Sequence, residues 1–364
     1  MSMGHYSTAP GKGHSPGNAF GPAAAGRAAG VDSGSPGGYN AAMADRIKAV
    51  VLAAGKSTRM KSGLSKVLHP ILGREIIRYL IDGLLACGLA EEDIVIVVGD
   101  NRAEIEKALG GRFLYARQQQ QLGTAHALLS AAEQVAAHDG GLLVLVGDNP
   151  YITAAELREL IDRQQQSGAA CTLVSAVFPE AIPPFGRIVR DTQGRVERIV
   201  EEKDASPAER GIREVNASIY LFANRIVFPL LAQIGNDNAK KEYYLTDIVA
   251  ILRREGLAVE ALPAADRDVA IGINDRCDLQ QAQAKFNLRR QRQLMLEAGV
   301  TILQPETVTI EHDVEVGRDT VLYPGTYLGA GTRIGRGCAI GPFAFLKNVR
   351  VGDGERLSFA KKEG

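Results

Sequence analysis

A short glycine-containing stretch near residue 50 carries the residues best suited to bind phosphate. The apolar run Ala49–Leu52 leads into Ala53-Ala54-Gly55, and two cations, Arg59 and Lys66, follow within eleven residues of Gly55. Small residues in a turn let backbone N–H groups approach a polyphosphate closely, and nearby cations spread its negative charge. The pattern therefore predicts a polyphosphate site in the loop that follows a strand.

Two better-known phosphate motifs do not fit this stretch. Gly55-Lys56-Ser57 imitates the end of a P-loop, but Val50 stands where that motif needs a glycine. The dinucleotide fingerprint needs glycines where Ser57 and Met60 stand. An ordinary tight turn before a helix would explain Gly55, but it would not explain the pair of cations.

The segments around this loop alternate between short apolar runs and helix-like stretches. Apolar runs occupy Lys48–Leu52, Asp93–Val98 and Leu142–Val146, and helix-like stretches occupy Arg74–Cys87 and Thr124–Ala137. This alternation predicts an open, mostly parallel (Rossmann-like) α/β sheet that is covered on both faces. Because such sheets bind ligands outside the carboxyl ends of their strands, the loops after Leu52 and Val146 are expected to meet at one site.

The C-terminal part of the chain has a different period. After a polar helix-like segment, residues 276–298, aliphatic residues recur at intervals of six: Ile310, Val316, Leu322, Leu328, Ile334, Ile340 and Leu346. A strict period of six predicts a left-handed parallel β-helix. We expect a Gly/Ala/Ser/Pro-rich disordered arm (1–44), an α/β domain (45–275), a connecting helix (276–299), a short β-helix (300–354) and a polar tail (355–364).

Composition excludes several classes of protein. Lys plus Arg and Asp plus Glu total 42 each, which argues against binding nucleic acid through bulk positive charge. No apolar run reaches the ~20 residues of a membrane span. The four cysteines form no CxxC pair, which argues against a disulfide framework or a zinc ribbon, and we expect a cytoplasmic protein.

Several ordered motifs resemble the nucleotidyltransferases that join a nucleoside triphosphate to a sugar 1-phosphate. The matching segments are Leu52-Ala-Ala-Gly-Lys-Ser-Thr-Arg-Met60, Lys66-Val-Leu-His69, Gln118-Gln-Gln-Gln-Leu-Gly-Thr-Ala-His126, Gly147-Asp-Asn-Pro150, Phe185-Gly-Arg-Ile188, Val200-Glu-Glu-Lys-Asp204, Val215-Asn216, Glu242-Tyr-Tyr-Leu-Thr-Asp247 and Gly272-Ile-Asn274. The E-Y-Y-L-T-D segment and the hexad tail favour the N-acetylglucosamine-1-phosphate uridylyltransferase half of the bifunctional uridylyltransferase/acetyltransferase family. On this resemblance, residues 45–275 would be the nucleotidyltransferase domain.

The resemblance implies roles for particular residues. Leu52, Ala54, Gly55, Lys66, Gln118, Gly123 and Thr124 would bind the nucleotide, with Arg59 and Lys66 acting catalytically on the phosphates. Gly186, Glu201 and Asn216 would contact the sugar, and Asp148 and Asn274 would hold Mg²⁺. The implied substrates are UTP and N-acetylglucosamine 1-phosphate, and the β-helix would form a homotrimer. Trimer, weak oligomer and monomer all stay open.

The chain also departs from the family pattern. Ser57, Ser65, Ala125 and Ala217 replace residues that are usual there, and Ala217 removes a hydroxyl near the expected sugar site. Most acetyltransferase residues of the family lie beyond the last residue of this chain, so we expect no acetyl transfer. Two alternatives remain: a glucose-1-phosphate uridylyl- or thymidylyltransferase, and a non-catalytic subunit that binds nucleotide sugars.

Overall fold

The computed structural model describes residues 47–364, and the predicted N-terminal arm lies outside the described residues. The strands of the α/β part are β1 (Ile47–Leu52), β4 (Ile94–Val98), β5 (Leu114–Arg117), β6 (Gly141–Val146), β7 (Cys171–Val177), β8 (Arg187–Arg190), β9 (Val196–Val200), β10 (Glu214–Ala223) and β11 (Val259–Pro263). The helices are α1 (Ile76–Ala86), α2 (Arg102–Leu109), α3 (Thr124–Leu129), α4 (Ala132–Val135), α5 (Ala154–Ser167), α6 (Pro207–Arg210), α7 (Asn224–Leu231), α8 (Ile248–Arg254) and α9 (Arg276–Glu297).

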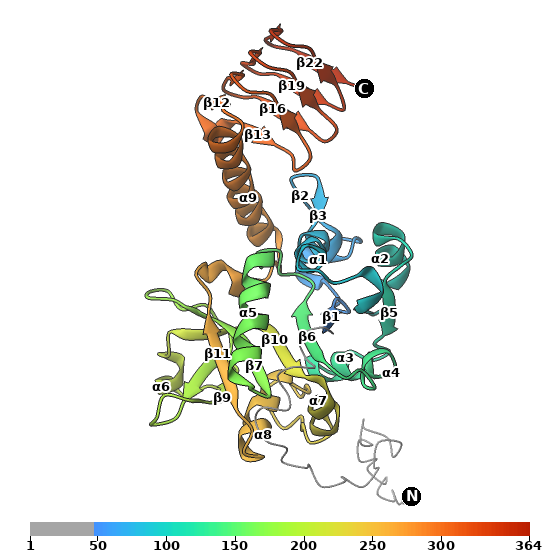
Figure 1. Ribbon diagram of the computed structural model, residues 1–364, viewed down its shortest axis with the longest axis vertical. Helices are drawn as coiled ribbons and strands as arrows, with labels where there is room; N and C mark the ends of the chain where they lie inside the picture. Colours follow the sequence, from blue (N-terminus) through green and yellow to red (C-terminus); the bar gives the residue numbers. More distant parts are fainter. Residues whose placement is uncertain (1–46) are drawn as a thin grey trace, which may run out of the picture. The chain divides into compact units, whose positions relative to one another are not determined.

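One large sheet organises the α/β part (Figure 1). Its strands lie in the order β11-β7-β10-β6-β1-β4-β5, and β8 joins β10 to β9 at one side. Strand β1 runs parallel to both neighbours, with Val50 opposite Val144 of β6 and Val95 of β4. Strand β10 is antiparallel to β6 and β7. The predicted open, mostly parallel α/β sheet is therefore confirmed, with one antiparallel strand inside it.

The central strands β1, β4 and β6 are covered on both faces of the sheet, which explains why they are apolar at nearly every position. In β1, Val51 packs into a core cluster that includes the apolar side of α1 and α5. The next residue back, Val50, points to the opposite face and packs with α3, α7 and α8. Both valines are fully buried. Successive side chains of a strand point to opposite faces, so each strand contributes to both layers.

Two predicted helices are shorter in the structure than in the sequence interpretation. The segment Arg74–Cys87 begins as strand β3 (Arg74–Glu75), which pairs with β2 (Pro70–Ile71), and helix α1 starts only at Ile76. The segment Thr124–Ala137 is divided into α3 and α4, because the chain leaves helical geometry at Ala131. Helical periodicity in the sequence did not reveal either interruption. Among the described residues, no helix is long and apolar enough to cross a membrane.

Helix α9 connects the α/β part to the C-terminal β-helix (Figure 1). It starts with a capping box, in which the Asp275 side chain accepts hydrogen bonds from the backbone N–H groups of Cys277 and Asp278. On one side of the helix, Asn287 and Gln291 donate to the Val308 carbonyl at 2.7 and 2.6 Å. These two residues are one helical turn apart, so α9 presents a continuous polar edge to the first coil.

The hexad segment forms the predicted parallel β-helix. Its short strands are β12 (Thr301–Ile302), β13 (Thr309–Ile310), β14 (Glu315–Val316), β15 (Val321–Leu322), β16 (Tyr327–Gly329), β17 (Arg333–Ile334), β18 (Ala339–Ile340), β19 (Phe345–Lys347), β20 (Arg350–Val351), β21 (Arg356–Leu357) and β22 (Lys361–Glu363). They stack into three parallel sheets, one for each side of the coil. All seven aliphatic hexad positions are buried.

The prediction that the β-helix ends near residue 354 and gives way to a polar tail is wrong. Strand β20 puts Val351 in register with Ile334, which shortens one interval in the repeat from six residues to five. Counting on in sixes from Val351 reaches Leu357 of β21, which pairs with Ile340. The final segment, β22, pairs in turn with β19. These strands do not follow a strict period of six, because one interval is a residue shorter.

Candidate active site

The loops after β1 and β6 meet at the carboxyl ends of these strands, as the parallel sheet requires. The Gly147 N–H donates to the Leu52 carbonyl at 2.9 Å, and the Ala53 N–H donates to the Val97 carbonyl at 2.8 Å. These bonds extend the strand pairing into the loops. They bring the small-residue turn at Ala53–Gly55 next to Asp148.

A pocket of about 510 Å³ opens over this meeting point. Every residue predicted to bind the nucleotide lines it, together with the predicted metal ligand Asp148: Leu52, Ala54, Gly55, Lys66, Gln118, Gly123 and Thr124. Arg59 is exposed and does not line this pocket. All seven predicted nucleotide-binding residues therefore lie around one pocket, whereas Arg59, predicted to act on the phosphates, is not among its lining residues.

Four polar side chains are linked beside this pocket, two of which, Lys66 and Asp148, line it. The Lys66 ammonium forms a close ion pair with the Asp148 carboxylate and donates to Asn274 Oδ1 at 3.1 Å. The Arg59 guanidinium donates to the same Asn274 oxygen at 2.8 Å. Asp148 and Asn274 are far apart in the sequence. The Ile273 N–H joins their loops by donating to the Asp148 carbonyl at 2.9 Å.

The geometry of these residues fits a magnesium ion. A carboxylate oxygen of Asp148 and the amide oxygen of Asn274 both contact the same cationic group, so both can face one cation. Oxygen donors of this kind suit Mg²⁺, which typically keeps water and substrate phosphates as its other ligands. A Cβ on Gly272 would lie 3.2 Å from Asp148 Oδ1, so glycine leaves room beside the carboxylate. In residues 47–364, no group of three His, Cys, Asp or Glu side chains offers a self-contained metal site.

The far end of the pocket has a closely packed backbone around Gly123. Its φ is +119°, and a Cβ there would lie 2.4 Å from the Tyr243 carbonyl oxygen. Gln118 is buried, and its side-chain amide donates to the Gly123 carbonyl at 3.1 Å and lies 3.1 Å from His126 Nδ1. The Thr124 hydroxyl accepts from the Leu245 N–H at 2.9 Å. The amide of Gln118 is therefore held in one orientation at this end of the pocket.

A second pocket, of about 340 Å³, adjoins the first. It contains the three predicted sugar-binding residues and both predicted metal ligands: Gly186, Glu201, Asn216, Asp148 and Asn274. The Asn216 N–H donates to the Gly186 carbonyl at 2.8 Å, which joins β10 to the loop before β8. Both pockets share Thr124, Val146, Asp148 and Glu242 as lining residues. The site is thus a pair of connected pockets with Asp148 at their junction.

Carboxylates near the second pocket have altered acidity. Burial raises the pKa of Glu201, although a 3.1 Å hydrogen bond from the Thr246 hydroxyl partly opposes the rise. Burial, and then the negative charges of Glu201 and Asp204, raise the pKa of Asp247 to about 6. These groups lie outside the Asp148–Asn274 pair. Because Glu201 lines the second pocket, the charge at this pocket depends on pH.

Two side chains at the site escaped the sequence interpretation. Ser57 has a left-handed backbone with a φ of +57°, and its hydroxyl accepts from the Lys66 N–H at 2.9 Å. It therefore holds Lys66 in place, a role that only the folded loop reveals. Tyr244 lines the second pocket, and its buried hydroxyl has no hydrogen-bond partner within the described structure. Its position in E-Y-Y-L-T-D was the available signal, but that signal did not separate packing from substrate contact.

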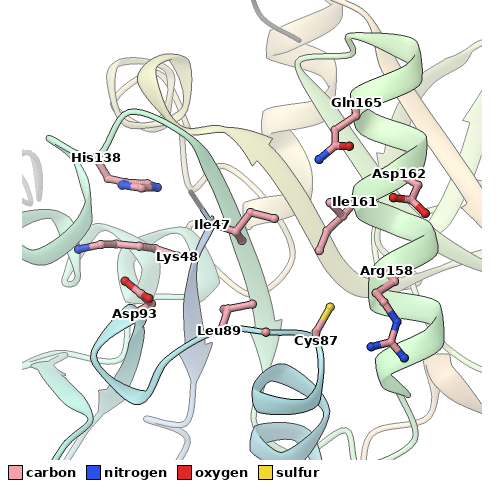
Figure 2. A pocket seen from close by; sticks show the side chains of 11 residues that line it. Ile47, Lys48, Cys87, Leu89, Asp93, His138, Arg158, Ile161, Asp162 and Gln165 are labelled. Carbon is pink, nitrogen blue, oxygen red and sulfur yellow. The ribbon is translucent and has the colours of Figure 1, made fainter. Parts of the chain in front are cut away.

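Another cavity, of about 570 Å³, lies at the opposite, amino ends of the strands. Figure 2 shows Lys48, Asp93 and His138 on one side of it and side chains of α5, including Arg158, on the other. None of the predicted site residues line this cavity. It lies where β1, β4 and β6 begin, whereas open α/β sheets bind substrates where their strands end. The paired pockets are therefore the candidate active site.

A mostly parallel sheet with a small-residue turn, two cations and paired carboxylate and amide oxygens at its carboxyl edge fits a nucleotidyltransferase, and comparison with known families shows that class. The model of the MobA-like NTP transferase domain matches residues 49–238, and the model of the bacterial transferase hexapeptide (six repeats) matches residues 313–348. The chain therefore belongs to the MobA-like NTP transferase family, and within it to the GlmU proteins, whose curated members it resembles over most of its length.

Three of these relatives illustrate the similarity. The bifunctional protein GlmU of Brevibacillus brevis is 44% identical over 315 residues, which cover 86% of this chain and 68% of the relative. The GlmU proteins of a Geobacillus species and of Pelotomaculum thermopropionicum are 43% and 46% identical, each over 85% of this chain and 66% of the relative. The chain thus spans about two thirds of the length of these relatives. The resemblance inferred from the motifs is confirmed, and so is a sugar-1-phosphate nucleotidyltransferase activity.

Proposed function

We propose that the protein transfers a uridylyl group from UTP to N-acetylglucosamine 1-phosphate, yielding UDP-N-acetylglucosamine and pyrophosphate. The observation that carries this proposal is the pair of connected pockets with Asp148 at their junction. A nucleotide in the first pocket and a sugar phosphate in the second would bring their phosphates together there. Holding two reactants in this way supplies much of the rate acceleration in phosphoryl transfer.

The reaction needs positioning and charge neutralisation more than proton transfer. The sugar phosphate, whose second pKa is about 6, is already an anionic nucleophile at neutral pH, so no general base is required. Its oxygen attacks the α-phosphorus of UTP, a new P–O bond forms, and the bond to the β-phosphate breaks to release pyrophosphate. We propose that Lys66 and Arg59, which both donate to Asn274, stabilise the negative charge on the departing group.

Asp148 and Asn274 are the residues that we propose to hold Mg²⁺. The ion would supply charge neutralisation at the phosphates, in addition to the charges of the two side chains. The Lys66 ammonium contacts both oxygens. We propose that Lys66 turns toward the phosphates when a metal ion binds Asp148.

The second pocket has polar groups that suit an amino sugar. Glu201 and Asn216 can bond to sugar hydroxyl and amide groups, because a carboxylate accepts hydrogen bonds and a carboxamide both donates and accepts them. The unpaired hydroxyl of Tyr244 adds a buried donor, and burial raises the pKa of Tyr244 to about 12, which keeps it protonated. Leaving such a buried group unpaired is costly, so a substrate that bonds to it is favoured.

The direct test is pyrophosphate release from the purified chain with Mg²⁺, UTP and N-acetylglucosamine 1-phosphate. We expect turnover in the wild type, loss of turnover with a chelator, and loss in Asp148→Asn. Asp319→Asn is the matched control, because it also removes one carboxylate, but from an exposed position on the β-helix. Turnover that survives chelation would contradict the metal-assisted mechanism.

Two alternatives are separated by the same assay. A higher kcat/KM with glucose 1-phosphate or with dTTP would assign the chain to a related transferase. Ala217, which lines the second pocket in place of a hydroxyl residue, would then be the first position to change. Binding of the nucleotide sugar without turnover would favour a non-catalytic subunit.

Two further proposals concern the β-helix. We propose a homotrimer on the basis of the family resemblance and the hexapeptide repeats, with the exposed rings of Phe343 and Phe359, whose centroids are 5.8 Å apart, as a candidate contact. Light scattering of the purified chain would give its mass. The expectation that this chain transfers no acetyl group stays a prediction, which an assay of coenzyme A release from acetyl-coenzyme A would check.

A further inference from the structure

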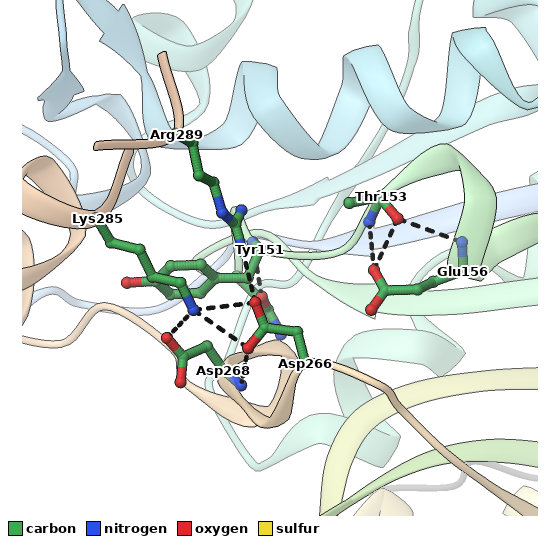
Figure 3. A network of polar contacts seen from close by, with 8 residues as sticks. Tyr151, Thr153, Glu156, Asp266, Asp268, Lys285 and Arg289 are labelled. Carbon is green, nitrogen blue, oxygen red and sulfur yellow. Dashed lines mark hydrogen bonds and ion pairs between the residues drawn. The ribbon is translucent and has the colours of Figure 1, made fainter. Parts of the chain in front are cut away.

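A compact cluster of charges joins helix α9 to the turn η6 (Arg267–Ala270) (Figure 3). The Lys285 ammonium lies 3.0 Å from the Asp266 carboxylate and forms a close ion pair with Asp268. Arg289, one helical turn further along α9, donates to Asp266 at 2.6 Å. Lys285 also lies over the ring of Tyr151, 5.3 Å from its centroid. The cluster therefore contacts both η6 and the segment that follows Asp148.

The cluster neutralises two carboxylates that would otherwise repel each other. Asp266 and Asp268 are two residues apart on one tight turn, and the Asp268 N–H donates to the Asp266 side chain at 3.0 Å. Burial opposes ionisation of Asp266, but this backbone bond and the nearby Lys285 and Arg289 lower its pKa. Because both carboxylates face the Lys285 ammonium, the geometry of η6 depends on that cation.

Turn η6 in turn holds the loop that carries Asp148. The side-chain amide of Asn149, the residue after Asp148, donates to the Val269 carbonyl in η6. Both Asn149 and Val269 are buried, so water cannot replace this hydrogen bond if it is broken. The other side-chain atom of Asn149, Oδ1, accepts from the Tyr151 N–H at 3.1 Å. A shift of η6 would therefore move the neighbouring Asp148, because the buried side-chain amide of Asn149 links the two segments.

The same turn also leads into Asn274. The backbone passes from η6 through Gly272, whose carbonyl accepts a 2.9 Å hydrogen bond from the Asn274 side chain. The Asn274 N–H donates to Asp278 in the first turn of α9 at 2.8 Å. Asn274 is therefore held between η6 and α9. Both proposed metal ligands are tied to the elements that Lys285 joins.

We propose that Lys285, assisted by Arg289, is a positioning residue that sets the distance between Asp148 and Asn274 and thereby the affinity for the divalent cation. The inference rests on the proposed function, because it assigns these two oxygens to the metal. Residues that orient metal ligands without touching the ion typically change affinity or activity 10- to 100-fold when they are replaced. Lys285 itself touches neither the substrates' pockets nor the metal ligands.

The experiment compares metal binding in four full-length proteins: wild type, Lys285→Met, Lys285→Arg and Arg292→Met. Arg292 is an exposed cation on the same helix and serves as the matched control. Mn²⁺ binding in the presence of UTP is followed by electron paramagnetic resonance, which reads the free ion and needs no turnover. The Mg²⁺ dependence of pyrophosphate release is measured in parallel.

We expect Lys285→Met to raise both the Mn²⁺ dissociation constant and the Mg²⁺ concentration for half-maximal rate about tenfold, with kcat recovered at saturating Mg²⁺. Lys285→Arg should recover most of the affinity, and Arg292→Met should equal the wild type. Unchanged Mn²⁺ affinity in Lys285→Met, or a loss of kcat that Mg²⁺ does not recover, would overturn the inference.

Two checks keep the outcomes distinct. If Lys285→Met does not fold, Asp268→Asn removes the partner carboxylate and should weaken Mn²⁺ binding in the same direction. An unchanged affinity there also overturns the inference. Failure of the proposed function would instead appear in the wild type, as absent turnover with UTP and N-acetylglucosamine 1-phosphate.

Discussion

Replacing Lys66 with methionine tests the electrostatic part of the mechanism most directly. The side chain keeps its length and much of its packing but loses the ammonium that contacts Asp148 and Asn274. Lys66 is only 17% exposed, so water replaces little of the lost charge. We expect the folded protein to retain UTP binding in part and to lose most of its turnover.

The size of the loss follows from Coulomb's law. A unit charge about 4 Å from another contributes roughly 4 kcal/mol at an effective dielectric constant near 20. Only the charge that develops as pyrophosphate departs counts toward catalysis, because charge already present in UTP strengthens ground-state binding equally. We therefore expect a loss of about 2–4 kcal/mol in transition-state stabilisation, which corresponds to a roughly 30- to 1000-fold lower kcat.

Steady-state pyrophosphate release at saturating Mg²⁺ measures kcat and KM separately. Lys61→Met is the matched control, because Lys61 is an exposed lysine in the same loop and lines neither pocket. Thermal unfolding of both variants would show whether the fold is retained. A Lys66→Met enzyme that is folded and within threefold of the wild-type kcat would refute the assigned role of the ammonium.

Three other changes give independent predictions. Gly123→Ala places a methyl group 2.4 Å from the Tyr243 carbonyl at a φ of +119°, so we expect a lower melting temperature and a raised KM for UTP, measured by calorimetry and steady-state kinetics. Ser57→Ala keeps the backbone strain but removes the acceptor for the Lys66 N–H. Loss of this hydrogen bond, which contributes about 0.5–1.5 kcal/mol, should lower kcat/KM roughly 2- to 13-fold. An unchanged kcat/KM would show that Ser57 does not position Lys66. Asp247, with a pKa of about 6, retains a proton in the folded state that the unfolded chain has lost, so its contribution to stability falls as pH rises through roughly 4 to 6. Asp247→Asn should therefore lessen the decline in melting temperature between pH 4.5 and pH 7.5, and an equal decline in both proteins would contradict that assignment.

Local sequence patterns predicted the parts of the fold that depend on local periodicity. The apolar runs around Val50 and Val144 and the buried hexad residues such as Leu328 lie where the patterns put them. The antiparallel direction of β10 was not predictable, because an apolar strand has the same composition in either direction. The strands from Val351 onward were not predicted, because one interval of five residues interrupts the period of six.

The candidate site was predictable to a different degree at each residue. Arg59 and Lys66 stand close to Gly55 in sequence, so elementary chemistry was enough to connect them with phosphate. Asp148 and Asn274 are brought together only by folding, and the family resemblance alone suggested the pairing. The sequence showed Ser57 only as a departure from the family pattern, because its role lies in a hydrogen bond to the Lys66 N–H that forms only in the folded loop.

The two sets of contacts made by α9 limit how the length of this helix can change. Lys285 and Arg289 face η6, whereas Asn287 and Gln291, which alternate with them in sequence, face the β-helix. One inserted residue turns everything beyond it by about 100° about the helix axis. Insertion of a single residue between Lys285 and Gln291 would therefore put the two contact sets out of phase, whatever its identity. Exchange of the modules on either side of this stretch, in evolution or by protein engineering, must therefore keep its length or change it by about seven residues, which make two helical turns.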